Sequence, residues 1–139
     1  MIRKYLLGWF VVVSILCTFL TGCSNGAKDL KESDLYGKYK ITLDYGTETI
    51  ELKSDRTFVQ TYVPYNGKTV VLRGRWRTLE QGTSQFQVEF RNILELDQFH
   101  APSPLRVPKE LYSLWPYGSR EETHLTNSPD YDKVYDKIK

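Results

Sequence analysis

The chain has 139 residues, a length that supports a single domain. It carries 19 basic and 17 acidic residues, and two of the basic ones, Arg3 and Lys4, lie in an N-terminal segment that has no acidic residue, so the remainder is electrically balanced. This balance gives no electrostatic reason to expect nucleic-acid binding. Both cysteines, Cys17 and Cys23, lie near the N-terminus, which excludes a disulfide or a thiolate metal site in the rest of the chain.

The N-terminus has the organisation of a secretory signal. Residues 1–4 form a short positive region, and residues 5–20 are uncharged and mostly apolar. As a helix this apolar stretch reaches roughly 24 Å, less than the ~30 Å hydrocarbon core of a bilayer. Small residues follow at Thr21 and Gly22. The pattern predicts a signal peptide over residues 1–22.

The end of this signal closely resembles the lipobox of bacterial lipoproteins, in the stretch Leu20-Thr21-Gly22-Cys23. The resemblance implies cleavage between Gly22 and Cys23 and attachment of a diacylglycerol to the Cys23 thiol, with the new amino group open to acylation. Two or three acyl chains anchor a protein far more firmly than one chain does. The alternative is an uncleaved N-terminal membrane helix in which the cysteine is incidental.

The lipobox resemblance also implies a location. It favours a bacterial cell envelope, and because Ser24 is not the aspartate that signals inner-membrane retention in enteric bacteria, it favours the outer membrane, facing the periplasm, in a host with two membranes. Residues 23–34 are small, polar and charged. We interpret them as the acylated cysteine and a flexible tether.

Residues 35–139 are predicted to form one all-β domain. Apolar side chains alternate with polar ones, as at Tyr39, Ile41 and Leu43, which is the period of a strand with one buried face. Turn residues separate such runs at short intervals, which predicts an antiparallel up-and-down meander that forms a small barrel or a strongly curved sheet. The predicted strands lie within residues 37–46, 49–53, 57–65, 68–78 and 84–92, with two closing strands in 121–127 and 131–139, the last of them alternatively a frayed tail.

Two connections have distinct signals. Asn66-Gly67 is the strongest short-range indication of a hairpin, and we expect a type I′ turn there. Residues 97–120 contain four prolines, which predicts a long connection and no central strand, with a helical turn over 109–115 as an option. A connection of that length in a small domain is usually functional or packed as a lid.

Four short motifs follow one another along this domain: Leu35-x-Gly37-x-Tyr39, Leu52-x-x-Asp55-x-Thr57-Phe58, Gly74-x-Trp76 and an apolar strand ending at Phe90. Together they resemble the small lipocalin-like lipoproteins of bacteria. The resemblance implies a β-barrel or curved sheet with the tryptophan packed under one barrel end, and it implies no single activity. It covers residues 35–92 well and the remainder loosely.

The sequence offers little for catalysis. His100 and His124 are the only histidines, and the Glu121-Glu122 pair near His124 is the nearest approach to a ligand set, whereas a zinc site needs three or four converging ligands. Motifs for an activated serine or a phosphate-binding loop are absent. We therefore expect a protein that is not an enzyme and that uses no metal or cofactor.

Arg73, Arg75 and Arg77 form a stripe along one predicted strand. Their period of two places all three on the outer face, opposite Trp76. Such a stripe suits phosphate groups of lipids or an acidic partner. The alternative is a solvated sheet face that is paired across to Glu51 and Glu89 and that protects an edge from aggregation.

Aromatic residues crowd the proline-rich segment at Tyr112, Trp115 and Tyr117. They are candidates for partner binding, since aromatic side chains dominate many interface hot spots. The alternative is a lid packed over the barrel end. Together with the arginine stripe, they lead us to expect a lipid-anchored binding module that recognises a protein partner, such as an assembly factor or a toxin-immunity protein. The second hypothesis is a lipocalin-like carrier of a small apolar ligand or lipid.

Overall fold

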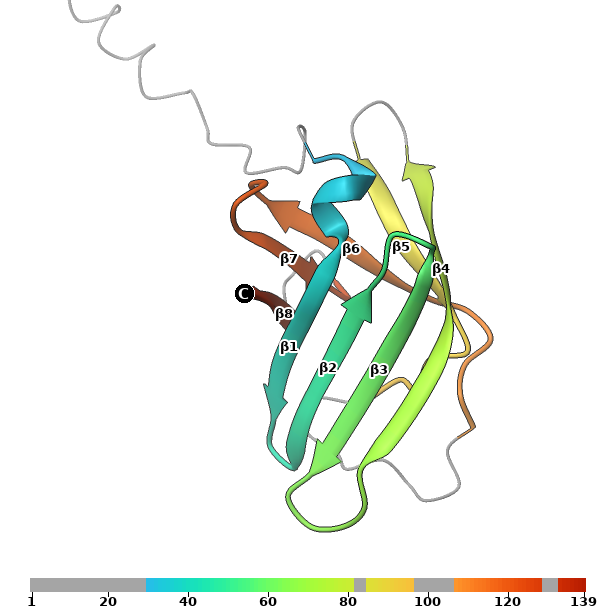
Figure 1. Cartoon of the computed structure of the whole chain (residues 1–139), viewed down its shortest axis with the longest axis vertical. Helices are drawn as coiled ribbons and strands as arrows, with labels where there is room; N and C mark the ends of the chain where they lie inside the picture. Colours follow the sequence, from blue (N-terminus) through green and yellow to red (C-terminus); the bar gives the residue numbers. More distant parts are fainter. Residues whose placement is uncertain (1–29, 82–84, 97–106, 129–132) are drawn as a thin grey trace, which may run out of the picture.

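The computed structural model describes residues 30–81, 85–96, 107–128 and 133–139. Within these residues, eight antiparallel strands follow one another in sequence order and close into a barrel (Figure 1). The predicted all-β up-and-down meander is confirmed, and the barrel closes because β8 pairs with β1. The strands are β1 (Gly37–Leu43), β2 (Gly46–Leu52), β3 (Thr57–Pro64), β4 (Val70–Gln81), β5 (Gln85–Arg91), β6 (Tyr112–Gly118), β7 (Thr123–Thr126) and β8 (Val134–Ile138).

Some of the sequence predictions fall outside the described residues. These are the signal peptide, the lipobox with Gly22 and Cys23, most of the tether, and His100 within the 97–120 segment. In the described part of the chain, no helix has both the length and the apolarity needed to cross a bilayer.

The apolar side chains at the alternating positions predicted from sequence fill the barrel interior. In β1 and β2, every second residue is buried, including Tyr39, Ile41, Ile50 and Leu52. Because successive side chains of a strand point to opposite sides, the intervening residues lie on the outer surface. Burying these large side chains contributes on the order of 1.5–3 kcal/mol each.

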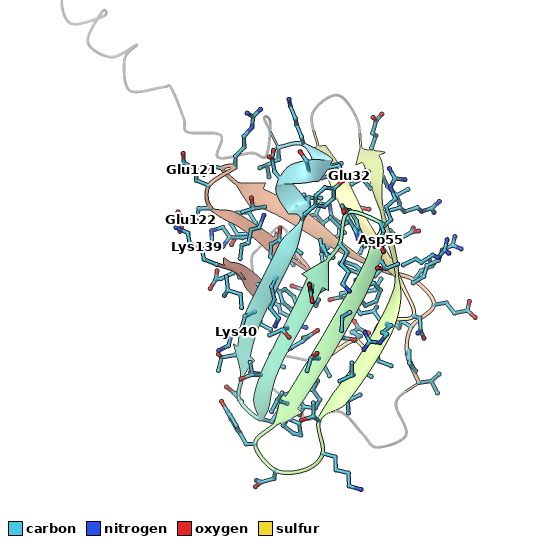
Figure 2. All side chains as sticks on the ribbon, viewed as in Figure 1. Glu32, Lys40, Asp55, Glu121, Glu122 and Lys139 are labelled. Carbon is cyan, nitrogen blue, oxygen red and sulfur yellow. The ribbon has the colours of Figure 1, made fainter. Side chains whose placement is uncertain are left out.

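A short 3-10 helix, η1 (Glu32–Leu35), closes one end of the barrel, opposite the β3–β4 hairpin (Figure 1). Leu35 is fully buried there, and its carbonyl accepts a hydrogen bond of 2.9 Å from the Tyr39 hydroxyl. The Lys137 ammonium donates to the Asp34 carbonyl at 2.5 Å, which ties η1 to β8. On the other side, Arg56 forms an ion pair with Glu32 at 3.2 Å. Figure 2 shows Glu32 and Asp55 at this same end.

Trp76 packs inside the barrel at the η1 end. It is 2% exposed, and its indole N–H lies 3.1 Å from the carbonyls of Lys53 and Thr57. The edge of the Trp76 ring meets the Tyr36 ring, with centroids 6.0 Å apart. An aromatic ring with a satisfied N–H therefore joins β4 to the β2–β3 turn.

The close packing around Gly74 explains why the Gly-x-Trp motif has a glycine at this position. A Cβ at this position would lie 2.1 Å from the Arg91 carbonyl oxygen and 2.6 Å from the Phe58 ring. The absence of a side chain lets β5 approach and lets the Phe58 ring pack edge-on against Phe90, with centroids 5.2 Å apart. The motif is therefore a packing requirement of the core.

The β3–β4 hairpin is confirmed, but its turn type differs from the prediction. The strands end at Pro64 and resume at Val70, so five residues form the loop. Gly67 has a φ of 125°, whereas Arg56 and Asn92 are the only non-glycine residues with positive φ in the described part of the chain. A type I′ turn requires positive φ at Asn66 as well, and the longer loop removes that requirement.

The 97–120 segment differs most from the sequence prediction. Its last part forms β6, which lies between β5 and β7, and the optional helical turn over 109–115 is replaced by extended chain. Pro116 is tolerated because the β5–β6 pairing extends only to Leu114, so this part of β6 has one paired neighbour, as in an edge strand.

Candidate functional site

The outer face of β4 carries the predicted arginine stripe. Arg73 and Arg75 are exposed, whereas Arg77 donates to Glu89 at 2.7 Å in the direct cross-strand pair. The expected pairing with Glu89 is therefore confirmed for Arg77. Glu51 lies across β3 from the stripe, because it pairs with Val59, which in turn pairs with Arg73.

The structure adds Arg91 to this stripe. Arg91 is exposed on β5 and pairs directly with Arg75 across the two strands. Among the described residues, no ion pair involves Arg73, Arg75 or Arg91. Like charges at directly opposed positions repel each other. We call these three residues the arginine face.

The backbone geometry fixes the position of Arg91. Gly74 allows the Arg91 carbonyl to approach β4, and the Asn92 side-chain amide donates to the Arg73 carbonyl at 2.8 Å. Asn92 has a φ of 68°, and the N–H groups of Asn92 and Ile93 both donate to the Lys109 carbonyl. Two residues opposite one carbonyl form a bulge, a feature that often redirects a strand at a barrel rim or beside a binding site.

A hollow of about 430 Å³ opens beside this bulge. The salt bridge between Lys109 and Glu95 supports one of its walls. Leu111 is 54% exposed here, and nearby in the chain Val107 is 80% exposed. The hollow is lined by Arg91, Asn92, Pro108, Lys109, Glu110 and Leu111.

Exposed apolar side chains also border the arginine face at the β3–β4 hairpin. Val71 lies two residues before Arg73 on the same outer face of β4, and Val63 and Tyr65 are exposed at the end of β3 and in the adjoining loop. Charge and exposed apolar surface therefore adjoin on one side of the barrel. Arginine flanked by apolar contacts is typical of protein interfaces.

The three candidate aromatic residues of β6 separate in the structure. Tyr112 pairs with the inward-facing Phe90 and packs against the core, and burial raises its pKa. Trp115 and Tyr117 have the opposite parity and lie on the outer face, where the Tyr117 ring stacks on His124 with centroids 4.9 Å apart.

Only part of the predicted site is therefore brought together. Glu89 pairs with Arg77 on one side and with Ser113 on the other, and Trp115 lies two residues further along β6. Trp115 and the arginine face thus share the outer side of three neighbouring strands, on opposite sides of the Arg77–Glu89 ion pair. Tyr112 does not belong to this surface.

A buried polar cluster of Glu48, Gln60, Lys133 and Tyr135 lies inside the barrel, and none of its four residues is among the site residues predicted from the sequence. Glu48 accepts hydrogen bonds from Lys133 at 3.1 Å, from Tyr135 at 2.9 Å and from Gln60 at 2.7 Å. Burial raises the pKa of Tyr135 well above its usual range, and the charge of Glu48 adds to this effect.

This buried cluster also holds the segment that follows β5. The Gln60 amide donates to the Leu94 carbonyl and accepts from the Leu94 N–H, while Lys133 donates to the Leu96 carbonyl at 2.9 Å. Leu94 and Leu96 are thereby kept in the core. Because each charged group is paired and enclosed, the arrangement suits a structural role more than access by a substrate.

His124 lies on the outer face of β7. Its Nδ1 is 2.8 Å from an Asp136 carboxylate oxygen, and its Nε2 is 4.0 Å from Glu122. Among the described residues, no group of three or more His, Cys, Asp or Glu side chains is placed to hold a metal ion.

Comparison with models of known protein families, with curated proteins and with solved structures finds no match to this chain. The functional assignment therefore depends on the sequence and on the geometry above.

Proposed function

We propose that this chain is a lipid-anchored protein of the bacterial cell envelope whose barrel recognises a protein partner without catalysing a reaction. The anchor follows from the lipobox resemblance at Leu20-Thr21-Gly22-Cys23. The observation that carries the binding role is the arginine face, which is exposed and bordered by apolar side chains and a hollow. Arginine with aromatic and apolar neighbours favours a protein interface.

The barrel interior favours outer-surface binding over the carrier hypothesis. Large side chains such as Tyr39, Phe58, Trp76 and Phe90 point inward and are buried. The polar groups of the buried Glu48 cluster are engaged by one another or by the backbone of 94–96. A lipid or small apolar ligand would have to displace these contacts.

The fold orients the arginine face relative to the proposed anchor. The described chain begins at Leu30, next to η1, and the β3–β4 hairpin with Val71 lies at the opposite end of the barrel (Figure 1). Leu30 is buried, so the reach from Cys23 is set by the six residues 24–29, which can extend at most about 22 Å. A module tethered at Cys23 would therefore hold its η1 end near the membrane and present the hairpin end to proteins in the adjacent space, as an envelope assembly factor or an immunity protein requires.

Site-specific photo-crosslinking in the host envelope tests this function. A photoreactive amino acid replaces Val71, which is exposed beside the arginine face, and a matched variant carries it at Lys40, on the outer face of β1 (Figure 2). We expect a discrete protein adduct from position 71 and none of the same mass from position 40. Identical patterns from both positions, or a non-covalently bound lipid recovered from the purified protein in place of a protein adduct, would contradict the proposal.

A further inference from the structure

The arginine face contains a cross-strand pair of like charges. Arg75 and Arg91 are directly opposed on β4 and β5, where Cβ atoms are typically 4.5–5.5 Å apart. Arginine remains charged at every physiological pH, so this repulsion cannot be relieved by deprotonation. An anion placed between the two guanidinium groups would relieve it.

The surroundings hold the pair in place. Gly74 separates Arg73 from Arg75 and allows the close approach of the Arg91 carbonyl, and Asn92 bonds to the Arg73 carbonyl. Any separation of β4 from β5 at this point would disrupt these contacts and the core packing of Phe58. The fold therefore keeps Arg75 and Arg91 at directly opposed positions on the outer surface, where a ligand can reach both.

The spacing of the arginines matches that of an extended acidic peptide. Arg73 and Arg75 are two residues apart on one strand, which is about 6.8 Å. In an extended peptide, acidic side chains at alternate positions have the same spacing. Each guanidinium group can donate two parallel hydrogen bonds to one carboxylate.

The neighbouring hollow favours carboxylates over phosphate. Its lining includes Leu111 and Glu110, which are both exposed. A dianionic phosphate would meet Glu110 with greater repulsion than a singly charged carboxylate would, and Leu111 offers apolar surface to a neighbouring peptide side chain.

We infer that the arginine face binds an acidic peptide segment of the protein partner, with one carboxylate shared by Arg75 and Arg91 and a second carboxylate, two residues along, bound by Arg73. This inference rests on the proposed function, and it specifies the chemistry of the partner.

Calorimetric titration of the full chain in a non-ionic detergent tests it. The probe is a hexapeptide that alternates glutamate with serine, and the control peptide has glutamine in place of glutamate. We expect binding of the glutamate peptide alone, weakened by salt. Arg75→Gln and Arg91→Gln should each lower the affinity at least about tenfold, whereas Lys40→Gln, which removes a distant positive charge, should change it less than about twofold.

Thermal unfolding separates a binding role from a structural one. Without peptide, Arg75→Gln should leave the melting temperature unchanged or raised, because the like-charge contact with Arg91 is removed. Arg77→Gln should lower the melting temperature, because it leaves the buried Glu89 without its partner. A lower melting temperature for Arg75→Gln would assign Arg75 to the fold and overturn the inference.

Other outcomes overturn it directly. These are equal binding of the two peptides, or tighter binding of inorganic phosphate or of phosphatidylglycerol vesicles that depends on Arg75. The crosslinking at Val71 distinguishes failure of the carboxylate site from failure of the proposed function. An adduct from position 71 that persists when Arg75→Gln is added removes the carboxylate site and keeps the proposed function, whereas absence of an adduct from position 71 in the chain that retains Arg75 removes the proposed function.

Discussion

The Lys133 ammonium lies 3.1 Å from a Glu48 carboxylate oxygen inside the barrel, although 85 residues separate the two in sequence. The two side chains are 3% and 1% exposed. The Lys133 ammonium also lies 4.8 Å from the centre of the Tyr135 ring. Glu48 thereby links β2 to the chain around β8, at the depth where the segment 94–96 enters the core.

We expect single substitutions of this pair to destabilise the barrel strongly. Glu48→Ala or Lys133→Met leaves the remaining charge buried without its counterion, and the free energy of unfolding should fall by about 3–5 kcal/mol. The double variant Glu48→Leu/Lys133→Met should recover part of this loss, because no buried charge is left uncompensated. Urea unfolding of all variants measures these values. Losses below about 1 kcal/mol for both single variants would contradict the buried ion pair.

We expect the buried tyrosines to make the folded chain lose stability at alkaline pH. Burial raises the pKa of Tyr39, Tyr112 and Tyr135 above the usual value near 10. Each phenol is favoured in its neutral form in the folded chain, so its contribution to stability is complete below pH ~10 and is lost as the pH rises above that value. Phenolate absorbance and circular dichroism, followed together, should change cooperatively. Ionisation of all tyrosines near pH 10 with the fold intact would contradict this prediction.

We expect the hydrogen bonds of Asp55 to make the fold less stable at acidic pH. Its carboxylate accepts hydrogen bonds from the Thr57 hydroxyl at 2.6 Å and from the Thr57 N–H at 2.9 Å, and these bonds lower its pKa. A carboxylate whose pKa is lowered by folding stabilises the folded chain at pH values above its pKa in the unfolded chain, which is near 4. This stabilisation is lost as the pH falls through the lower pKa of the folded chain. Asp55→Ala should therefore lower the melting temperature at pH 7 and change it less at pH 3. Asp44→Ala, in the exposed β1–β2 turn, is the control. If Asp55→Ala lowered the melting temperature by the same amount at pH 7 and at pH 3, the role of ionised Asp55 would be refuted.

Trp76 should contribute through both volume and hydrogen bonding. Trp76→Ala removes a buried ring and should lower the free energy of unfolding by about 3–5 kcal/mol. Trp76→Phe keeps an aromatic ring but removes the N–H that reaches Lys53 and Thr57, and we expect a smaller loss of about 1–2 kcal/mol. Chemical unfolding of the two variants distinguishes the contribution of the ring volume from that of the N–H hydrogen bonds. A neutral Trp76→Ala would mean that the ring is not part of the core.

Cys23 should determine processing of the proposed lipoprotein. Cys23→Ala removes the thiol to which the diacylglycerol would attach, so we expect an unprocessed precursor that remains associated with the membrane through its apolar N-terminus. Immunoblotting of cell fractions, with mass spectrometry of the N-terminus, measures this outcome, and Cys17→Ala is the matched control. Normal cleavage between residues 22 and 23 in Cys23→Ala would contradict the lipobox assignment.

The period-two pattern predicted much of the fold because it reports burial directly. It places Gln60 on the same face as Phe58 and Tyr62, and the same parity places Glu48 with Ile50. These inward polar positions were the available signal for the buried cluster. Their partner Lys133 could not be identified, because the contact depends on barrel closure between distant strands.

The candidate surface was predicted in part for a similar reason. Alternation places Arg73 and Arg75 outward from sequence alone, but the opposition of Arg91 depends on the β4–β5 register. That register also brings the Arg91 carbonyl close to Gly74. The strand β6 was missed because proline usually indicates a break, and Pro116 is accommodated only where pairing with β5 has ended.

The seam between β1 and β8 consists of three residue pairs, from Lys38 with Ile138 to Lys40 with Asp136. A ribosome or a translocation pore delivers these two strands at very different times. Until residues 136–138 emerge, β1 and the most recently formed strand both present unpaired backbone to their surroundings, as sheet edges that can pair with another chain. The cylinder is therefore completed late, by a contact between distant parts of the chain, and a slow final step should accompany its biogenesis.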